Sequence, residues 1–239
     1  MQPIDVWQVE NLRLTFFFDT ADRLSWLGLW TKITGQEPEN RSEKLSLMQI
    51  TEDGIWREQK LLSVIQHDRI DIFWCAVNID FELPNAGKFI DVVDLFCQDV
   101  LDILSEEMAL TITRAAFGAV LLCPTENHEK AYELLSRFLS SIKIDLKSRE
   151  FFYQINNPVQ SLENKSMTIN RLTKWSAIRS QFITIASGAK NPVNEFFASR
   201  LELDINSVAD ILYSKDHPIS QRDILEFVDI AKIIAQSGN

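Results

Sequence analysis

The chain has 239 residues, of which 46% are hydrophobic and 24% charged, so it can bury a sizeable core and does not have the composition of a disordered protein. Its formal net charge of −10 argues against duplex DNA as the default partner, because neutralising phosphates requires clustered Lys and Arg. The acidic charge permits a basic protein partner, but solubility alone is the favoured explanation.

The cysteines and the termini indicate the compartment. Cys75, Cys97 and Cys123 are odd in number, far apart and set among apolar residues, which favours reduced, buried thiols over a disulfide framework. The N-terminal residues contain neither a basic region nor an apolar run, so we expect no secretory signal. No apolar stretch reaches the length of about 18 residues that a membrane helix needs. We therefore expect a cytoplasmic protein.

The first part of the chain predicts a strand, a helix, three strands and a second helix. A run of three Phe favours a first strand that is covered on both faces, and Asp53-Gly54 is typical of a hairpin turn between the second and third strands. Apolar residues at helical spacing indicate the helices. The strands are expected over 12–18, 45–50, 55–60 and 70–77, and the helices over 21–34 and 89–103.

The second part predicts the same order again. A strand over 167–182 is too long to run unbroken, so we expect a bulge or bend within it. Pro124 and Pro218 are placed where helices begin. The strands are expected over 110–122, 151–155, 167–182 and 196–205, and the helices over 124–142 and 218–234.

This repetition predicts an α+β fold built from a duplicated strand-helix-three strands-helix unit. Both units end with a hydrophobic-Asp-hydrophobic strand, at 77–81 and 201–205, that leads into a helix. We expect antiparallel sheets with helices on one face, related by a pseudo-twofold and either joined edge to edge or lying side by side. The halves are 1–108 and 109–239, which could also form one continuous domain. The order resembles that of duplicated folds such as the TATA-binding protein. The acidic charge argues against the DNA binding which that resemblance implies.

No familiar catalytic motif is present. The histidines His67, His128 and His217 have no partner at metal-ligand spacing, and the glycines are isolated rather than grouped as in a phosphate-binding loop. We therefore predict no catalytic residue, no metal ligand and no cofactor. Many active sites have no local signature, so an enzyme is kept as a third interpretation.

One segment differs in charge from the rest. Between Asn164 and Asn194 there is no Asp or Glu, although the chain contains 34. On one face of a strand Arg171 and Arg179 would flank Trp175, while Lys174 lies on the opposite face. Such a surface suits an anion, a single-stranded nucleic acid or an acidic protein segment. The alternative, which the abundance of carboxylates in the chain favours, is a central strand whose Arg residues pair with acids of neighbouring strands or helices.

The leading functional interpretation is a non-catalytic protein-interaction module that serves as an adaptor, an inhibitor or immunity-type protein, or a subunit of a larger assembly. Its binding residues are predicted to be Arg171, Lys174, Trp175 and Arg179. The alternative interpretation is a nucleic-acid or nucleotide-binding component that uses the basic 165–190 face.

Overall fold

The computed structural model describes residues 6–19, 26–77, 82–104, 112–186, 189–208 and 219–238, with side chains described outside 182–194. The strands are β1 (Gln8–Phe18), β2 (Asn40–Lys44), β3 (Gln49–Trp56), β4 (Gln59–Ile65), β5 (Arg69–Cys75), β6 (Ile112–Thr125), β7 (Phe152–Asn156), β8 (Val159–Gln160), β9 (Thr168–Ala186) and β10 (Ala189–Ser207). The helices are α1 (Leu29–Thr34), α2 (Phe89–Leu101), α4 (His128–Phe138) and α5 (Gln221–Ser237), with a short 3-10 helix at Leu45–Leu47.

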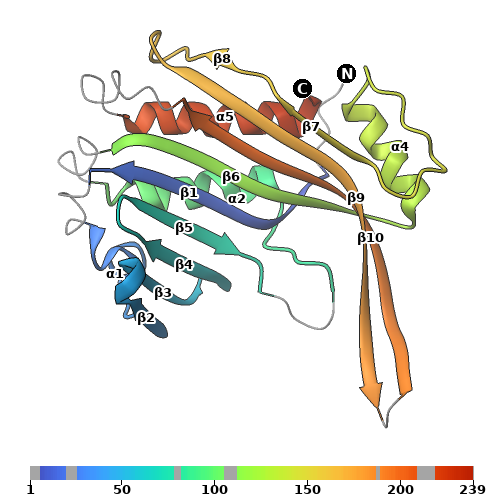
Figure 1. The fold of residues 1–239 in the computed structure, drawn as a ribbon, viewed down its shortest axis with the longest axis horizontal. Coiled ribbons are helices and arrows are strands. Elements are labelled where there is room, and N and C mark those ends of the chain that lie inside the picture. The colour runs from blue at the N-terminus through green and yellow to red at the C-terminus, as the bar shows by residue number, and fades with distance from the viewer. Residues whose placement is uncertain are drawn as a thin grey trace.

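These strands form a single antiparallel sheet, so the α+β class is confirmed (Figure 1). The strand order is β2-β3-β4-β5-β1-β6-β10-β9-β7, and β8 pairs with β9 off this path. β1 and β6 pair along the middle of the sheet and join the earlier strands to the later ones. The two parts of the chain therefore share one sheet.

The described helices all pack against the same face of this sheet, where alternate strand residues form the core. The contacts that show this are Trp30 Nε1 donating to the Leu61 carbonyl, Trp74 stacking on Phe96, the Ser199 hydroxyl donating to the Ala131 carbonyl, and Trp7 Nε1 donating to the Ala235 carbonyl. Each contact joins a helix to the core, and the expectation of helices on one face is met in the described residues. None of the described helices lies on the other face.

The Phe run of β1 alternates between the two faces. Phe16 and Phe18 are buried on the helix-covered face, where both stack on Trp26. Phe17 is half-buried on the opposite face, under the guanidinium groups of Arg69 and Arg114. The first strand is thus covered by helices on one side and by arginine side chains on the other.

The predicted duplication is not evident in the architecture as a whole. The first part contributes strands of 5 to 8 residues after β1, whereas β9 and β10 of the second part each have 19 residues. The two parts form one continuous sheet, joined edge to edge by β1 and β6. The strand over 167–182 is also not broken as expected, since β9 is continuous and the register shift lies opposite it in β10, between Pro192 and Asn194.

The predicted hairpin at Asp53-Gly54 is wrong, because β3 runs straight through both residues. The turn lies instead at Arg57 and Glu58, which have φ values of 51° and 64°. Gly54 serves a close approach, since a Cβ at this position would lie 3.0 Å from the Trp30 ring. Gly54 therefore marks close packing against α1 and not a turn.

α4 and α5 each begin after a residue whose side chain caps the helix. Pro124 lies in β6, and α4 begins after Asn127, whose side chain accepts a hydrogen bond of 2.9 Å from the Lys130 backbone N–H. Of the helix expected over 21–34, the structure describes the residues from Trp26 onward, and α1 is helical over Leu29–Thr34. Pro218 lies outside the described residues. Ser220 caps α5 through a capping box with Asp223.

Candidate functional site

The structure corrects the expectation that Trp175 offers an exposed stacking surface. Its side chain is 0% exposed, lies in the core near the rings of Trp7 and Phe138, and donates its indole N–H to the Thr173 hydroxyl at 3.2 Å. The strand phase on which Arg171 and Arg179 accompany Trp175 is the helix-covered phase. Trp175 therefore contributes to the stability of the fold and not to a surface.

The three predicted basic residues separate in space and are partnered. Arg171 donates through Nε to the Asn157 carbonyl at 2.7 Å. Lys174, on the opposite phase, lies 3.5 Å from the Glu202 carboxylate, and Arg179 pairs with Glu195. This is largely the arrangement of the alternative interpretation, in which the strand's cations meet acids of its neighbours. Their role in binding a partner stays a prediction.

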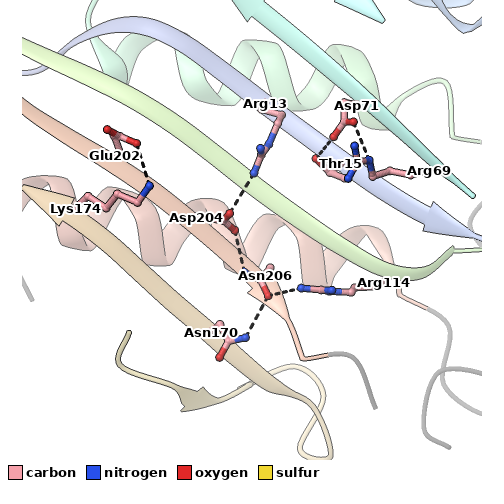
Figure 2. Close-up of polar contacts among 10 residues, drawn as sticks. All are labelled: Arg13, Thr15, Arg69, Asp71, Arg114, Asn170, Lys174, Glu202, Asp204 and Asn206. Carbon is pink, nitrogen blue, oxygen red and sulfur yellow. Dashed lines mark hydrogen bonds and ion pairs between the residues drawn. The ribbon is translucent and has the colours of Figure 1, made fainter. Parts of the chain in front are cut away.

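The polar side chains gather on the sheet face opposite the described helices, which we call the open face. Figure 2 shows its centre, where polar residues of neighbouring strands are linked in series. Arg13 lies 3.3 Å from Asp204, and Asp204 accepts a hydrogen bond of 2.8 Å from the Asn206 amide. Asn206 in turn accepts hydrogen bonds from Arg114 at 3.0 Å and Asn170 at 3.2 Å. The network spans β1, β6, β10 and β9.

A second polar group lies beside it on β1 and β5. The Thr15 hydroxyl donates to Asp71 at 2.7 Å, and Arg69 reaches the other oxygen of that carboxylate at 2.9 Å. Thr15 and Asp71 are both buried, so hydrogen bonding compensates for much of the lost hydration of the carboxylate. The contacts fix the charged groups of the open face in defined positions.

The open face is hollowed at Gly118, on the central strand β6. This hollow has a volume of about 180 Å³ and its wall includes Arg13, Phe73, Leu172, Lys174, Glu202 and Asp204. A Cβ on Gly118 would lie 3.2 Å from the Nε and Nη2 atoms of Arg13, so the missing side chain leaves the path that Arg13 takes toward Asp204. Because the hollow combines cations, carboxylates and apolar groups, it is a candidate ligand site.

Sequence reasoning missed these residues, although two signals could have found them. Gly118 interrupts an otherwise apolar strand, which often marks a close backbone approach. Glu202, Asp204 and Asn206 recur at every second position of a strand, which places polar groups on one face of it. Local sequence patterns could not predict the pairing of β6 with β1 and β10, which brings Arg13 to Asp204.

The β9–β10 hairpin extends beyond the sheet as a projecting arm (Figure 1). The pairing of β7 with β9 ends at Ser176, and that of β6 with β10 ends at Phe197. Beyond these points the arm pairs only with itself, up to Ala186 and Ala189. Each of its strands therefore has a backbone edge without a strand partner in the described residues.

The thiols are less uniformly buried than expected. Cys97 is fully buried, and burial strongly raises its pKa, whereas Cys75 and Cys123 are half-buried and have pKa values raised by partial desolvation. All three are free. Within the described ranges, no three His, Cys, Asp or Glu side chains lie together as a metal site would require. No helix in those ranges is long and apolar enough to cross a membrane.

Comparison with known proteins leaves the site to be interpreted from its geometry. No protein-family model matches the chain, and a search of curated proteins finds no match either.

Proposed function

We propose that this protein is a protein-interaction module that engages its partner by strand addition along the β9–β10 arm. The observation that carries this proposal is the arm itself: a two-stranded ribbon that leaves the sheet with both backbone edges unpaired within the described residues. An isolated two-stranded ribbon is marginally stable in water, and its free N–H and C=O groups form a template for another strand.

The two edges of the arm differ in a way that favours β9 as the binding edge. The β10 side contains Lys190 and Pro192 and a register shift, which are features that discourage edge pairing. The β9 side, over 177–186, contains no Pro, no Gly and one charged residue, Arg179. A strand of high β-propensity and low charge with an unpaired edge can pair with a strand of a partner protein.

The alternative, nucleic-acid or nucleotide binding through the 165–190 face, has less support. Lys174 and Arg179 lie against carboxylates, which offset the positive potential that would attract phosphates. Whether the module acts as an adaptor, an inhibitor or immunity-type protein, or a subunit of an assembly depends on which partner the arm binds.

The test is an affinity capture from the native host with the full chain and a variant with a shortened arm. Ser180 and Phe196 are opposite each other in the ladder, so residues 181–195 can be replaced by Asn-Gly, which closes a two-residue hairpin. A matched control with Lys130→Ala on the exposed surface of α4 keeps the arm intact. We expect the full chain and the control to retain the same protein and the shortened chain to lose it, with similar thermal melts. Retention by a folded, shortened chain contradicts the proposal.

The internal duplication also remains a proposal. It is supported by matching neighbours: β1 pairs with the last strand of its part, β5, as β6 pairs with the last strand of its own part, β10. The central β1–β6 pair is antiparallel, as a twofold between the halves requires. Superposition of 11–106 on 110–236 tests it, and an overlay of fewer than about four of the six expected elements rejects it.

A further inference from the structure

We propose that the hollow over Gly118 binds a small zwitterion of the amino-acid type, with its carboxylate at Arg13 and its ammonium group at Glu202 and Asp204. This site lies on the open face at the centre of the sheet, formed by strands β5, β1, β6, β10 and β9. It is separate from the arm, so the proposal does not rest on strand addition.

The strand register places opposite charges on opposite sides of the hollow. One row across the sheet runs Phe73, Arg13, Gly118, Asp204, Leu172. The next row runs Asn11, Val120, Glu202, Lys174. Arg13 crosses over Gly118 toward Asp204, so Val120 forms the low centre of the hollow, with Arg13 on the β1 side and Glu202 and Asp204 on the β10 side. The backbones of β1 and β10 are two strand spacings apart, about 10 Å, but the Arg13 and Asp204 side chains approach to 3.3 Å, which suits a ligand whose two charges are a few bonds apart.

Each carboxylate that would hold the ammonium group has one close partner and one looser partner. Asp204 accepts a hydrogen bond of 2.8 Å from Asn206, and Glu202 accepts one of 2.6 Å from Arg200. The looser Arg13–Asp204 and Lys174–Glu202 distances are 3.3 Å and 3.5 Å, and the side chains of Arg13 and Asp204 are 32% and 38% exposed. Arg13 Nε is shielded from solvent and has no hydrogen-bond acceptor among the described residues. A ligand carboxylate could accept from both Nε and Nη2 in the bidentate geometry that guanidinium groups favour, once Arg13 turns from Asp204.

The size and lining of the hollow restrict the ligand. Its volume of about 180 Å³ is below the roughly 300–1,000 Å³ of sites for drug-sized molecules, which favours a ligand no larger than a single amino acid. Val120 lies between the charges and Phe73 and Leu172 add apolar lining on either side of them, so a zwitterion with a short apolar side chain fits better than a small ion. The open position of the site implies a weak affinity, with a Kd of the order of 1 mM.

Isothermal titration calorimetry on the full chain, at low ionic strength, tests the proposal. The probes are the standard amino acids, with propionate and ethylamine as controls that carry one of the two charges. At least one amino acid with an apolar side chain is expected to bind, and both single-charge controls are expected to bind at least about tenfold more weakly, a difference of about 1.4 kcal/mol. Absence of binding by every amino acid up to about 10 mM, or equal binding of a single-charge control, overturns it.

Variants on the two sides of the hollow locate the binding. Arg13→Gln and Asp204→Asn should each reduce affinity at least about tenfold, because each removes one charged contact. Lys130→Ala on α4 is the control and should leave affinity unchanged. Both altered side chains are partly exposed, so the fold is expected to survive, and a thermal melt checks this. Unchanged affinity in either folded variant places the ligand elsewhere and overturns the proposal.

Discussion

The guanidinium group of Arg13 passes over the bare backbone of Gly118 and lies 3.3 Å from the carboxylate of Asp204, 191 positions along the chain. The pair is partly exposed, so solvent screening should keep its contribution small. We expect a double-mutant cycle with Arg13→Gln and Asp204→Asn, followed by urea unfolding, to give a coupling free energy of about 0.2–1 kcal/mol. A coupling above about 2 kcal/mol would show that the pair is a principal support of the sheet rather than a poised polar contact.

The burial of Trp175 predicts a large loss of stability on truncation. Trp175→Ala should lower the free energy of unfolding by about 3–5 kcal/mol, because the cavity would open between Trp7 and Phe138. Phe152→Ala is the matched control, since Phe152 is an aromatic residue of the adjacent strand β7 that is 63% exposed. Denaturant unfolding compares the two, and similar small losses in both variants would mean that the indole is not a core residue.

Two glycine exchanges in the same hairpin should act in opposite directions. Glu58→Gly is expected to stabilise the protein by up to about 1 kcal/mol, because Glu58 has φ 64°, which costs an L-residue energy that glycine avoids. Gly54→Ala should destabilise by about 1–3 kcal/mol, because its Cβ would lie 3.0 Å from Trp30 and 3.1 Å from the Glu39 side chain. Thermal melts measure both. Glu58→Ala is the control for Glu58→Gly and should give no gain.

Comparison of the predicted and observed elements shows which parts of the fold could be predicted from the sequence. The strand of three Phe, the helix starting at Phe89 and the strand before Asn156 were predicted correctly, because their apolar spacing is a local property of the chain. The Asp53-Gly54 turn was predicted wrongly, because a glycine that makes room for Trp30 looks the same in sequence as a glycine that turns the chain.

The candidate site was largely beyond sequence reasoning for a related reason. The acid-free segment includes the whole of β9, and the phase of that strand decides which of its side chains are exposed. Only the pairing with β10 and packing against α4 placed Trp175 inside, with Lys174 outside. The charges that face the hollow come from β1, β9 and β10, and their proximity depends on long-range strand pairing that no local pattern specifies.

The base of the arm should respond to acid. Hydrogen bonds from Gln181 and Arg179 lower the pKa of Glu195 below its usual range. A carboxylate with a lowered folded-state pKa stabilises the fold above its unfolded pKa, and this stabilisation is lost as the pH falls through the lower folded value. The protection factors of the backbone amides at 177–181, which correct for the intrinsic pH dependence of exchange, should therefore fall at acid pH before those of the central strands. Glu195→Gln should have low protection factors at 177–181 already at neutral pH and show no such acid step.

The thiols should separate into two classes. Burial raises the pKa of Cys97 most strongly and removes access to it, whereas Cys75 and Cys123 are half-buried with pKa values that are also raised. With a thiol reagent near pH 8, we expect slow labelling of Cys75 and Cys123 and none of Cys97 until denaturant is added. Mass spectrometry of the labelled peptides assigns the sites. Rapid labelling of Cys97 in the folded protein would be incompatible with its complete burial in α2.

The hydrogen bond of 2.8 Å from the Trp7 indole to the Ala235 carbonyl joins positions 228 residues apart, and it has a consequence for synthesis of the chain. When β6 leaves the ribosome, one of its neighbours, β1, has already been made, while the other, β10, has not. β6 lacks its second neighbour until β10 has been synthesised, and the Trp7 hydrogen bond cannot form until α5 has been synthesised. A nascent chain that stalls before β10 would thus hold a bare central strand, which makes it a natural client for chaperones.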